Sequence, residues 1–163
     1  MKKLQLQVIL FFLLMSMPLV YTLASDVIRI DYPDDFRNWV HVKSSLINEK
    51  HPLFETFGGI HHIYANSKAL KALKEKTAYP DGSIFVFDLK YASPYEGGIE
   101  EGKRRRIDVM QRGQQKFGDT GGWGFGSFSG DSENLMKQNV TEKCFSCHLS
   151  QGENHYVFSK YGL

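Results

Sequence analysis

The sequence has little excess charge of either sign, only two cysteines, and neither an internal repeat nor a long low-complexity segment. Its 20 lysines and arginines exceed its 18 acidic residues by two, and Lys2 and Lys3 at the start account for that difference. This balance argues against a general nucleic-acid binder, because such proteins carry a basic surface. We expect the run Lys103–Arg106 to be a solvated turn or strand end rather than a docking site.

The long apolar run of the chain lies at its beginning. It extends from Val8 to Met15 and continues more weakly to Leu23, after the positive Lys2 and Lys3. Small residues at Thr22 and Ala24 suit a signal peptidase, so we expect residues 1–24 to be a signal peptide and residues 25–163 to form one exported domain. An uncleaved membrane anchor is the alternative, although the segment is barely long enough to span a bilayer.

The two cysteines lie close together, as Cys144 and Cys147 of the stretch CFSCH. A disulfide between them would close a very small loop and contribute little stability. A redox pair is typical of a βαβ context, which the neighbouring sequence lacks, and zinc needs about four ligands in a tetrahedron. The redox pair and the zinc site remain as alternatives to the interpretation that follows.

The spacing C-x-x-C followed by histidine is the signal for covalent attachment of a c-type haem. Two residues between the thiols let one turn of chain span the porphyrin edge, so each cysteine can form a thioether with a vinyl group. The adjacent His148 can then bind the iron as the proximal ligand. We expect one covalently attached haem c, held by Cys144, Cys147 and His148.

The remaining elements predict an α+β fold, with an antiparallel sheet flanked by helices in a single domain. We expect a helix over 67–79 with Ser67 as its cap, a helix over 131–151, and an extended tail from His155. We expect four strands, at 59–66, 83–92, 104–113 and 119–130, and a hairpin loop at 93–103.

The sixth iron position decides the function. A histidine or methionine there makes an electron carrier, whereas an apolar pocket leaves the iron open to small ligands. Composition does not choose among the candidates, which are His41, His51, His61, His62, His155, Met110 and Met136.

The chain as a whole resembles the cytochrome P-460 family, which includes the related cytochrome c′-beta. The resemblance is carried, in order, by YPDDFRNWVHVKS, FGGIHHIYAN, YPDGSIFVFDL, KFGDTGGWGF, CFSCH and YVFSKY, and it covers nearly all of residues 30–161. It implies an exported or periplasmic homodimer with a five-coordinate haem c, a proximal histidine and an open distal face.

The resemblance implies two possible activities, which a single position separates. Members of the family proper oxidise hydroxylamine and carry a covalent bond from a lysine to the porphyrin. The c′-beta relatives lack this bond and bind nitric oxide in a phenylalanine-rich pocket. The lysine position falls on Phe87 in SIFVFDL, and Lys90 should point to the opposite face of the strand.

Three further positions are assigned by the same resemblance. The upstream distal aromatic residue matches Phe57, a distal arginine of the enzymes falls on His61, and a proton-transferring carboxylate falls on Asp108. His61 and Asp108 would form a distal proton relay if both reached the distal space, although His61 could instead face solvent or pair with a haem propionate. Asp108 could equally pair with one of Arg104–Arg106.

We therefore expect an exported haem c protein that binds nitric oxide or another small diatomic gas and resembles c′-beta. A hydroxylamine-oxidising cytochrome is the alternative, and an electron-transfer cytochrome c is a weaker one. The expected partners are a small gaseous or nitrogenous ligand, an unidentified redox partner and a second copy of the chain.

Overall fold

The computed structural model describes residues 29–136 and 140–162. The expected signal peptide at 1–24 lies outside the described residues. Within them, no helix combines the length and the apolar character that crossing a membrane requires.

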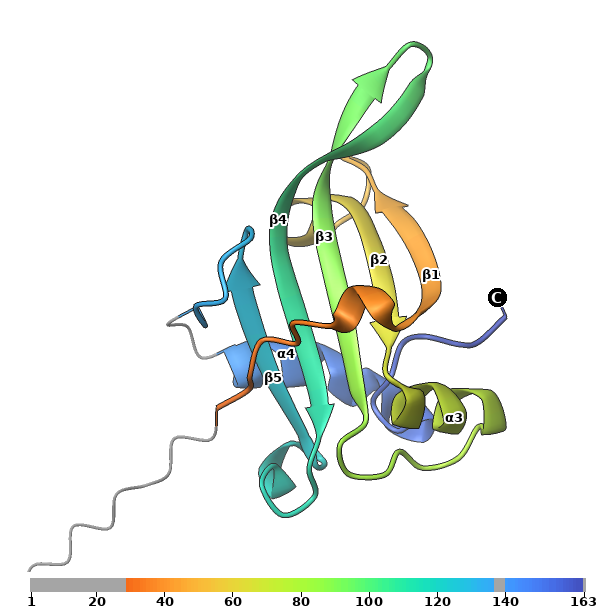
Figure 1. The fold of residues 1–163 in the computed structure, drawn as a ribbon, viewed down its shortest axis with the longest axis vertical. Helices are drawn as coiled ribbons and strands as arrows, with labels where there is room; N and C mark the ends of the chain where they lie inside the picture. Colours follow the sequence, from red (N-terminus) through yellow and green to blue (C-terminus); the bar gives the residue numbers. More distant parts are fainter. Residues whose placement is uncertain (1–28, 137–139, 163) are drawn as a thin grey trace, which may run out of the picture.

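The fold is an α+β domain built on one antiparallel sheet of five strands in the order β1-β2-β3-β4-β5 (Figure 1). This confirms the expected fold class. The strands are β1 (Val40–Ile47), β2 (Gly59–Ala65), β3 (Ile84–Tyr95), β4 (Gly98–Arg112) and β5 (Trp123–Ser129). The helices are α2 (Phe54–Phe57), α3 (Ser67–Glu75) and α4 (Val140–His148), with short 3-10 turns η1 (Phe36–Asn38), η2 (Gly118–Thr120) and η3 (Leu149–Asn154).

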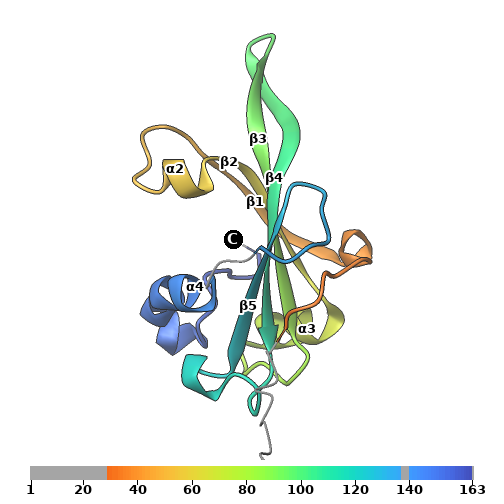
Figure 2. The ribbon, with the colours of Figure 1, turned by 90° about the vertical axis from the view of Figure 1, so that its left-hand side faces the viewer.

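The two faces of the sheet carry separate apolar clusters, because successive side chains of a strand point to opposite sides. Phe85, Met110 and Phe125 belong to the cluster on the side of α3 and α4. Val86 and Phe128 belong to the cluster on the other side, which the N-terminal segment and η1 cover. Figure 2 shows α2 and α4 on one side of the sheet and the N-terminal segment on the other.

The cap of α3 differs from the expected one by one residue. Asn66, not Ser67, precedes the helix, and its side-chain Oδ1 accepts a hydrogen bond from Ala69 N at 3.0 Å. The same oxygen accepts a bond from Ile84 N at 3.1 Å. Asn66 is therefore favoured over Ser67 because its longer side chain reaches both the helix and β3. The helix ends at Glu75, short of the expected residue 79, because its C-cap Lys76 is left-handed with φ 55°.

The β3–β4 hairpin is longer than expected. Most of 93–103, predicted as a loop, is paired strand, and the chain reverses at Glu96-Gly97, both of which have positive φ. A two-residue turn of this kind matches the twist of the strands that flank it. Pro94 and several glycines suggest a loop locally, but pairing between the two arms satisfies the backbone groups. The arm projects beyond the sheet (Figure 1).

Two predictions for the C-terminal part were wrong in extent. The helix expected over 131–151 is limited to Val140–His148 in the described residues, and Leu135 instead forms a bridge with Phe128. The tail expected to be extended begins with a tight turn at His155 and Tyr156. That turn determines the surroundings of His148.

Candidate functional site

The helix α4 brings the three residues of the haem signal to one side of the sheet. Cys144 is partly buried and packs against the cluster that contains Phe125 and Met110, whereas Cys147 is exposed. Residues three apart lie on the same face of a helix, so both sulfurs point to one side of α4. Both cysteines are free thiols. Burial, and then the negative charge of Asp108, raise the pKa of Cys144 to about 11.

His148 ends α4 and has one ring nitrogen already engaged. Its Nδ1 lies 2.6 Å from the backbone carbonyl oxygen of Tyr156, to which a protonated Nδ1 donates. Phe125 and Phe158 enclose the imidazole, with ring centroids 5.1 Å and 4.9 Å away. Burial lowers the pKa of His148, and the bond to Tyr156 opposes this. In the resulting neutral tautomer Nε2 carries the lone pair, the arrangement that a metal-binding histidine requires.

Three of the residues predicted on the distal side meet around Phe87. The ring of His61, from β2, stacks on Phe87 with centroids 4.6 Å apart and planes inclined by 17°. Phe57, from α2, meets Phe87 edge-on at 5.9 Å. Phe87 is opposite Asp108 on β4 and belongs to the face that carries α4. The fold thus unites three residues that lie on separate segments of the sequence.

His61 is buried rather than facing solvent, with 7% of its surface exposed. Burial lowers its pKa to about 4, and the positive charges of Lys43 and His62 add to the effect. Its Nδ1 is buried and has no hydrogen-bond partner among the described residues. A neutral imidazole with an unmatched nitrogen is costly unless another group satisfies it.

Asp108 lies on the same face but is engaged elsewhere. Its Oδ2 pairs with Arg106 Nε at 2.9 Å, and its Oδ1 accepts a bond from Ser127 Oγ at 2.5 Å. Burial raises the pKa of Asp108, whereas Arg106 and Ser127 oppose the rise. Arg106 and Ser127 hold the carboxylate of Asp108, and β3 with Phe87 separates β2, which carries His61, from β4, which carries Asp108. His61 and Asp108 are therefore not joined directly into a relay.

The basic run on β4 is structural rather than solvated, contrary to the expectation. Arg104 pairs through Nε with the buried Asp88 at 2.6 Å. Arg105 donates to the backbone carbonyl of Gly58, and Arg106 covers Phe57 as well as pairing with Asp108, with its guanidinium carbon 4.7 Å from the ring centroid. Arg104 and Arg106 reach opposite faces although they are two residues apart, because the β3–β4 register shifts between Leu89 and Lys90 and leaves Arg105 as an extra residue.

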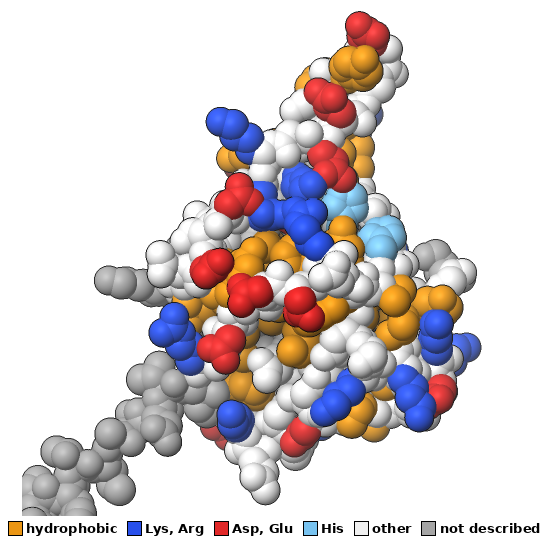
Figure 3. Space-filling model, in the orientation of Figure 1, with side chains coloured by type: hydrophobic (Ala, Val, Ile, Leu, Met, Phe, Trp, Pro, Cys, Tyr) orange, Lys and Arg blue, Asp and Glu red, His pale blue; other side chains and the backbone are white. Residues whose placement is uncertain are grey.

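Lys90 points away from the distal residues, which confirms the prediction from strand alternation. It pairs with Glu101, whose other oxygen lies 2.5 Å from His62 Nε2. His62 and His41 both approach Ser44 on this opposite face, at 2.6 Å and 2.8 Å. Figure 3 shows basic, acidic and histidine side chains gathered near the base of the hairpin. Of the sixth-ligand candidates, His41 and His62 therefore lie on the wrong side of the sheet.

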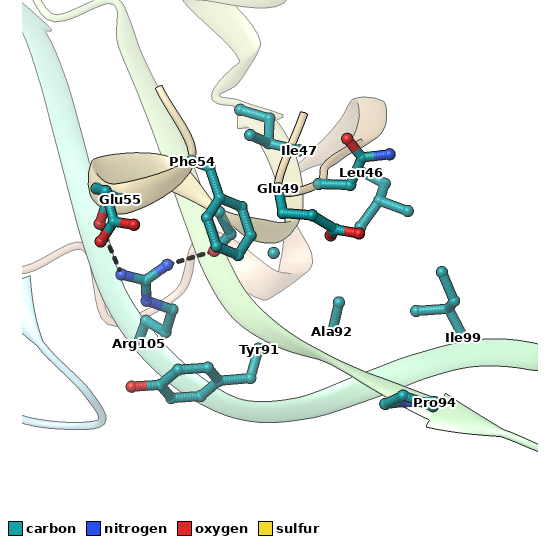
Figure 4. A pocket seen from close by; sticks show the side chains of 13 residues that line it. Leu46, Ile47, Glu49, Phe54, Glu55, Tyr91, Ala92, Pro94, Ile99 and Arg105 are labelled. Carbon is teal, nitrogen blue, oxygen red and sulfur yellow. Dashed lines mark hydrogen bonds between the residues drawn. The ribbon is translucent and has the colours of Figure 1, made fainter. Parts of the chain in front are cut away.

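A cavity of about 390 Å³ lies away from the haem signal. It lies between β1, α2 and the base of the β3–β4 arm, with Leu46, Phe54, Tyr91 and Ile99 among its lining residues (Figure 4). Arg105, at its edge, donates to the carbonyls of Gly58 and Glu55, which anchors α2 to β4. Besides its apolar side chains, the hollow is lined by Glu49, Glu55 and Arg105.

The residues around α4 give no support to zinc. Within 29–136 and 140–162, no group of three or more histidine, cysteine or acidic residues is placed to hold a metal ion.

Sequence reasoning missed the Tyr156 carbonyl and the Ser127 hydroxyl, because a backbone group has no sequence signature and Ser127 lies in a glycine-rich strand. Only the sheet register places Ser127 beside Asp108.

A comparison with known families identifies the family of this chain. The family model described as cytochrome P-460 matches residues 33–159, which is well over half of the chain. No curated protein matches the sequence. The match includes every residue discussed at the candidate site, from His41 to Phe158. The chain therefore belongs to the cytochrome P-460 family and is a haem c protein of that type.

Proposed function

We propose that this chain is an exported haem c protein with an open distal iron position that binds nitric oxide or another small diatomic gas, as cytochrome c′-beta does. The observation that carries the proposal is the contact of Phe87 with both Phe57 and His61 on the face that carries α4. Phe87 occupies the position at which a cross-linking lysine is expected in the hydroxylamine-oxidising members.

The residues on α4 fit a c-type haem. Cys144 and Cys147 are free to form thioethers, and His148 has its Nδ1 bonded and its Nε2 unbonded by any described residue. We assign His148 Nε2 as the iron ligand and the two cysteines as the attachment points. The haem iron then supplies the position at which a small gas binds.

The chain's own distal residues favour a small neutral ligand. Phe57 and Phe87 are apolar rings that exclude water from the space beside them. His61 is neutral near pH 7, because its pKa of about 4 lies far below that pH. Neutral His61 therefore does not attract an anion. The Nδ1 of His61, which has no hydrogen-bond partner among the described residues, can bond to a polar ligand atom.

Hydroxylamine oxidation is the second candidate, and Asp108 favours it. This carboxylate has a raised pKa and lies on the same face as His61, so it could accept a proton during oxidation. Against this role, Arg106 and Ser127 already hold both of its oxygens. Phe87 also offers no amine for a bond to the porphyrin. An electron-transfer role would require His61 or a methionine to occupy the sixth iron position.

Two assays on the purified holoprotein test the proposal. Titration of the ferrous protein with nitric oxide should give a saturable change of the optical spectrum, and hydroxylamine with an electron acceptor should give no turnover. Sustained turnover would favour the second candidate, and absence of a nitric oxide complex would contradict the first.

Homodimer formation and export remain part of the proposal. The projecting arm exposes Tyr95 and Ile99 at 56% and 55%, beside the hollow lined by Leu46 and Tyr91. Exposed apolar side chains on the arm, next to a hollow that is partly lined by apolar side chains, suit a self-complementary contact with a second copy. Analytical ultracentrifugation should give twice the chain mass, and a single chain mass at micromolar concentration would contradict the dimer.

A further inference from the structure

We propose that Trp123 is a positioning residue for His148 and acts through the turn formed by His155 and Tyr156. The inference rests on the proposed role of His148 as the iron ligand. It concerns how firmly the Tyr156 carbonyl is held against the Nδ1 of that histidine, 2.6 Å away.

The turn has an unusual backbone. His155 and Tyr156 both have positive φ, at 52° and 67°, although neither is glycine. Residues with side chains adopt this region rarely, and they keep it only where the surrounding structure enforces it. Two consecutive residues in this conformation direct the Tyr156 carbonyl back toward the end of α4.

Trp123 supplies a hydrogen bond that enforces this turn. Its indole Nε1 donates to the carbonyl oxygen of His155 at 3.0 Å, and the side chain is fully buried at the start of β5. Tyr156 N also donates to the Gln151 carbonyl at 2.8 Å. Gly121 leaves room for the Tyr156 ring, since a Cβ at Gly121 would lie 2.5 Å from that ring.

The indole bond matters because the turn has space into which to relax. A small cavity of about 60 Å³ lies between Tyr79, Trp123, His155 and Tyr156. Without the indole donor, the His155–Tyr156 peptide can rotate toward this space, which would lengthen the distance from the Tyr156 carbonyl to His148 Nδ1. A histidine that donates to a carbonyl is a more basic metal ligand with a fixed ring orientation. Trp123 would thus strengthen the iron–histidine bond from a distance.

The test compares the two tryptophans of the chain in the holoprotein. Trp123→Phe removes the donor and keeps an aromatic ring, whereas Trp39→Phe makes the same change in the cluster on the opposite face. In Trp123→Phe, resonance Raman of the ferrous protein should place the iron–histidine stretching band at lower frequency, and the reduction potential should shift to a more positive value. Trp39→Phe should leave both at their wild-type values.

Two failures are distinguishable. A wild-type spectrum without an iron–histidine band would overturn the assignment of His148 and with it this part of the proposed function. A wild-type band that is present but identical in Trp123→Phe would overturn the role of Trp123 alone. Should Trp123→Phe not accumulate as holoprotein, benzothienylalanine at position 123 replaces only the N–H by sulfur. The same two shifts are then expected, and their absence contradicts the role.

Discussion

His148, which is half-buried, and His61, which is buried, lie on the same side of one sheet, and they differ in what their ring nitrogens contact. Burial lowers the pKa of both. His148 has its Nδ1 fixed by the Tyr156 carbonyl, whereas the Nδ1 of His61 has no partner among the described residues. His61 stacks on Phe87 instead.

This difference suggests a division of roles. A histidine with one nitrogen bonded to a carbonyl has a defined tautomer and a free lone pair on the other, which suits a permanent ligand. A histidine with an unsatisfied nitrogen beside apolar rings is costly in the isolated chain, and a bound group would reduce that cost. The His148 side therefore suits attachment, and the His61 side suits a ligand that arrives later.

The largest expected effect concerns attachment on the His148 side. Cys144→Ser combined with Cys147→Ser should abolish covalent haem, because a hydroxyl does not form the thioether. Haem staining of a denaturing gel measures this directly. Ser146→Ala, between the two cysteines, is the matched control and should keep full staining. A stained band from the double variant would refute the anchor.

The second prediction concerns the acid stability that His61 controls. The unfolded chain binds a proton on this residue below pH 6.5, but the folded chain does so only near pH 4, so folding stability falls as the pH drops through that window. His61→Phe should remove up to about 3 kcal/mol of this loss. Denaturant unfolding of the holoprotein at pH 7 and pH 4 measures the difference. Asp108 is present in the wild type and in His61→Phe, so it contributes equally to the pH dependence of both. Parallel profiles of unfolding free energy against pH would contradict the burial of His61 as a neutral group.

A third, smaller effect concerns ligand entry. Phe87→Ala should open the distal face and speed association of nitric oxide several-fold, as measured by stopped-flow absorbance. Phe158→Ala removes a ring of the same kind from the His148 side, where it lies 4.9 Å from that imidazole, and should leave the rate unchanged. Equal rates in wild type and Phe87→Ala would mean that Phe87 does not lie over the iron.

The smallest effect is expected from Lys90. Lys90→Ala should leave the ferric spectrum and the nitric oxide rate unchanged, since this side chain pairs with Glu101 on the opposite face. A change in the porphyrin spectrum would show that Lys90 reaches the haem after all.

Much of the fold could be predicted from the sequence because strand alternation is a local signal. The alternation in GIHHIYAN separates His61 from His62, and the structure places the two on opposite faces as expected. The same rule placed Phe87 and Lys90. The existence and start of helix α3 were predicted, but it ends at Glu75 rather than at residue 79, and its cap was missed because the choice between Asn66 and Ser67 depends on the distant Ile84.

The features that sequence could not predict depend on long-range pairing. The arm from Ala92 to Glu101 contains turn-forming residues, yet it is strand because its two halves face one another. Pairing of Asp108 with an arginine of the 104–106 run was anticipated and is confirmed for Arg106, but its second partner, Ser127, comes from the register of β4 and β5. The position of the Tyr156 carbonyl near His148 depends on the turn at His155 and Tyr156, and neither residue type predicts the positive φ of that turn.

The central claim is that the iron has His148 on one side and an open position on the side of Phe57, His61 and Phe87. The optical and electron paramagnetic resonance spectra of the purified ferric protein test it most directly. We expect a five-coordinate, high-spin haem without the long-wavelength band of a lysine cross-link. A six-coordinate, low-spin spectrum would contradict it, because His61 or another side chain would then occupy the sixth position.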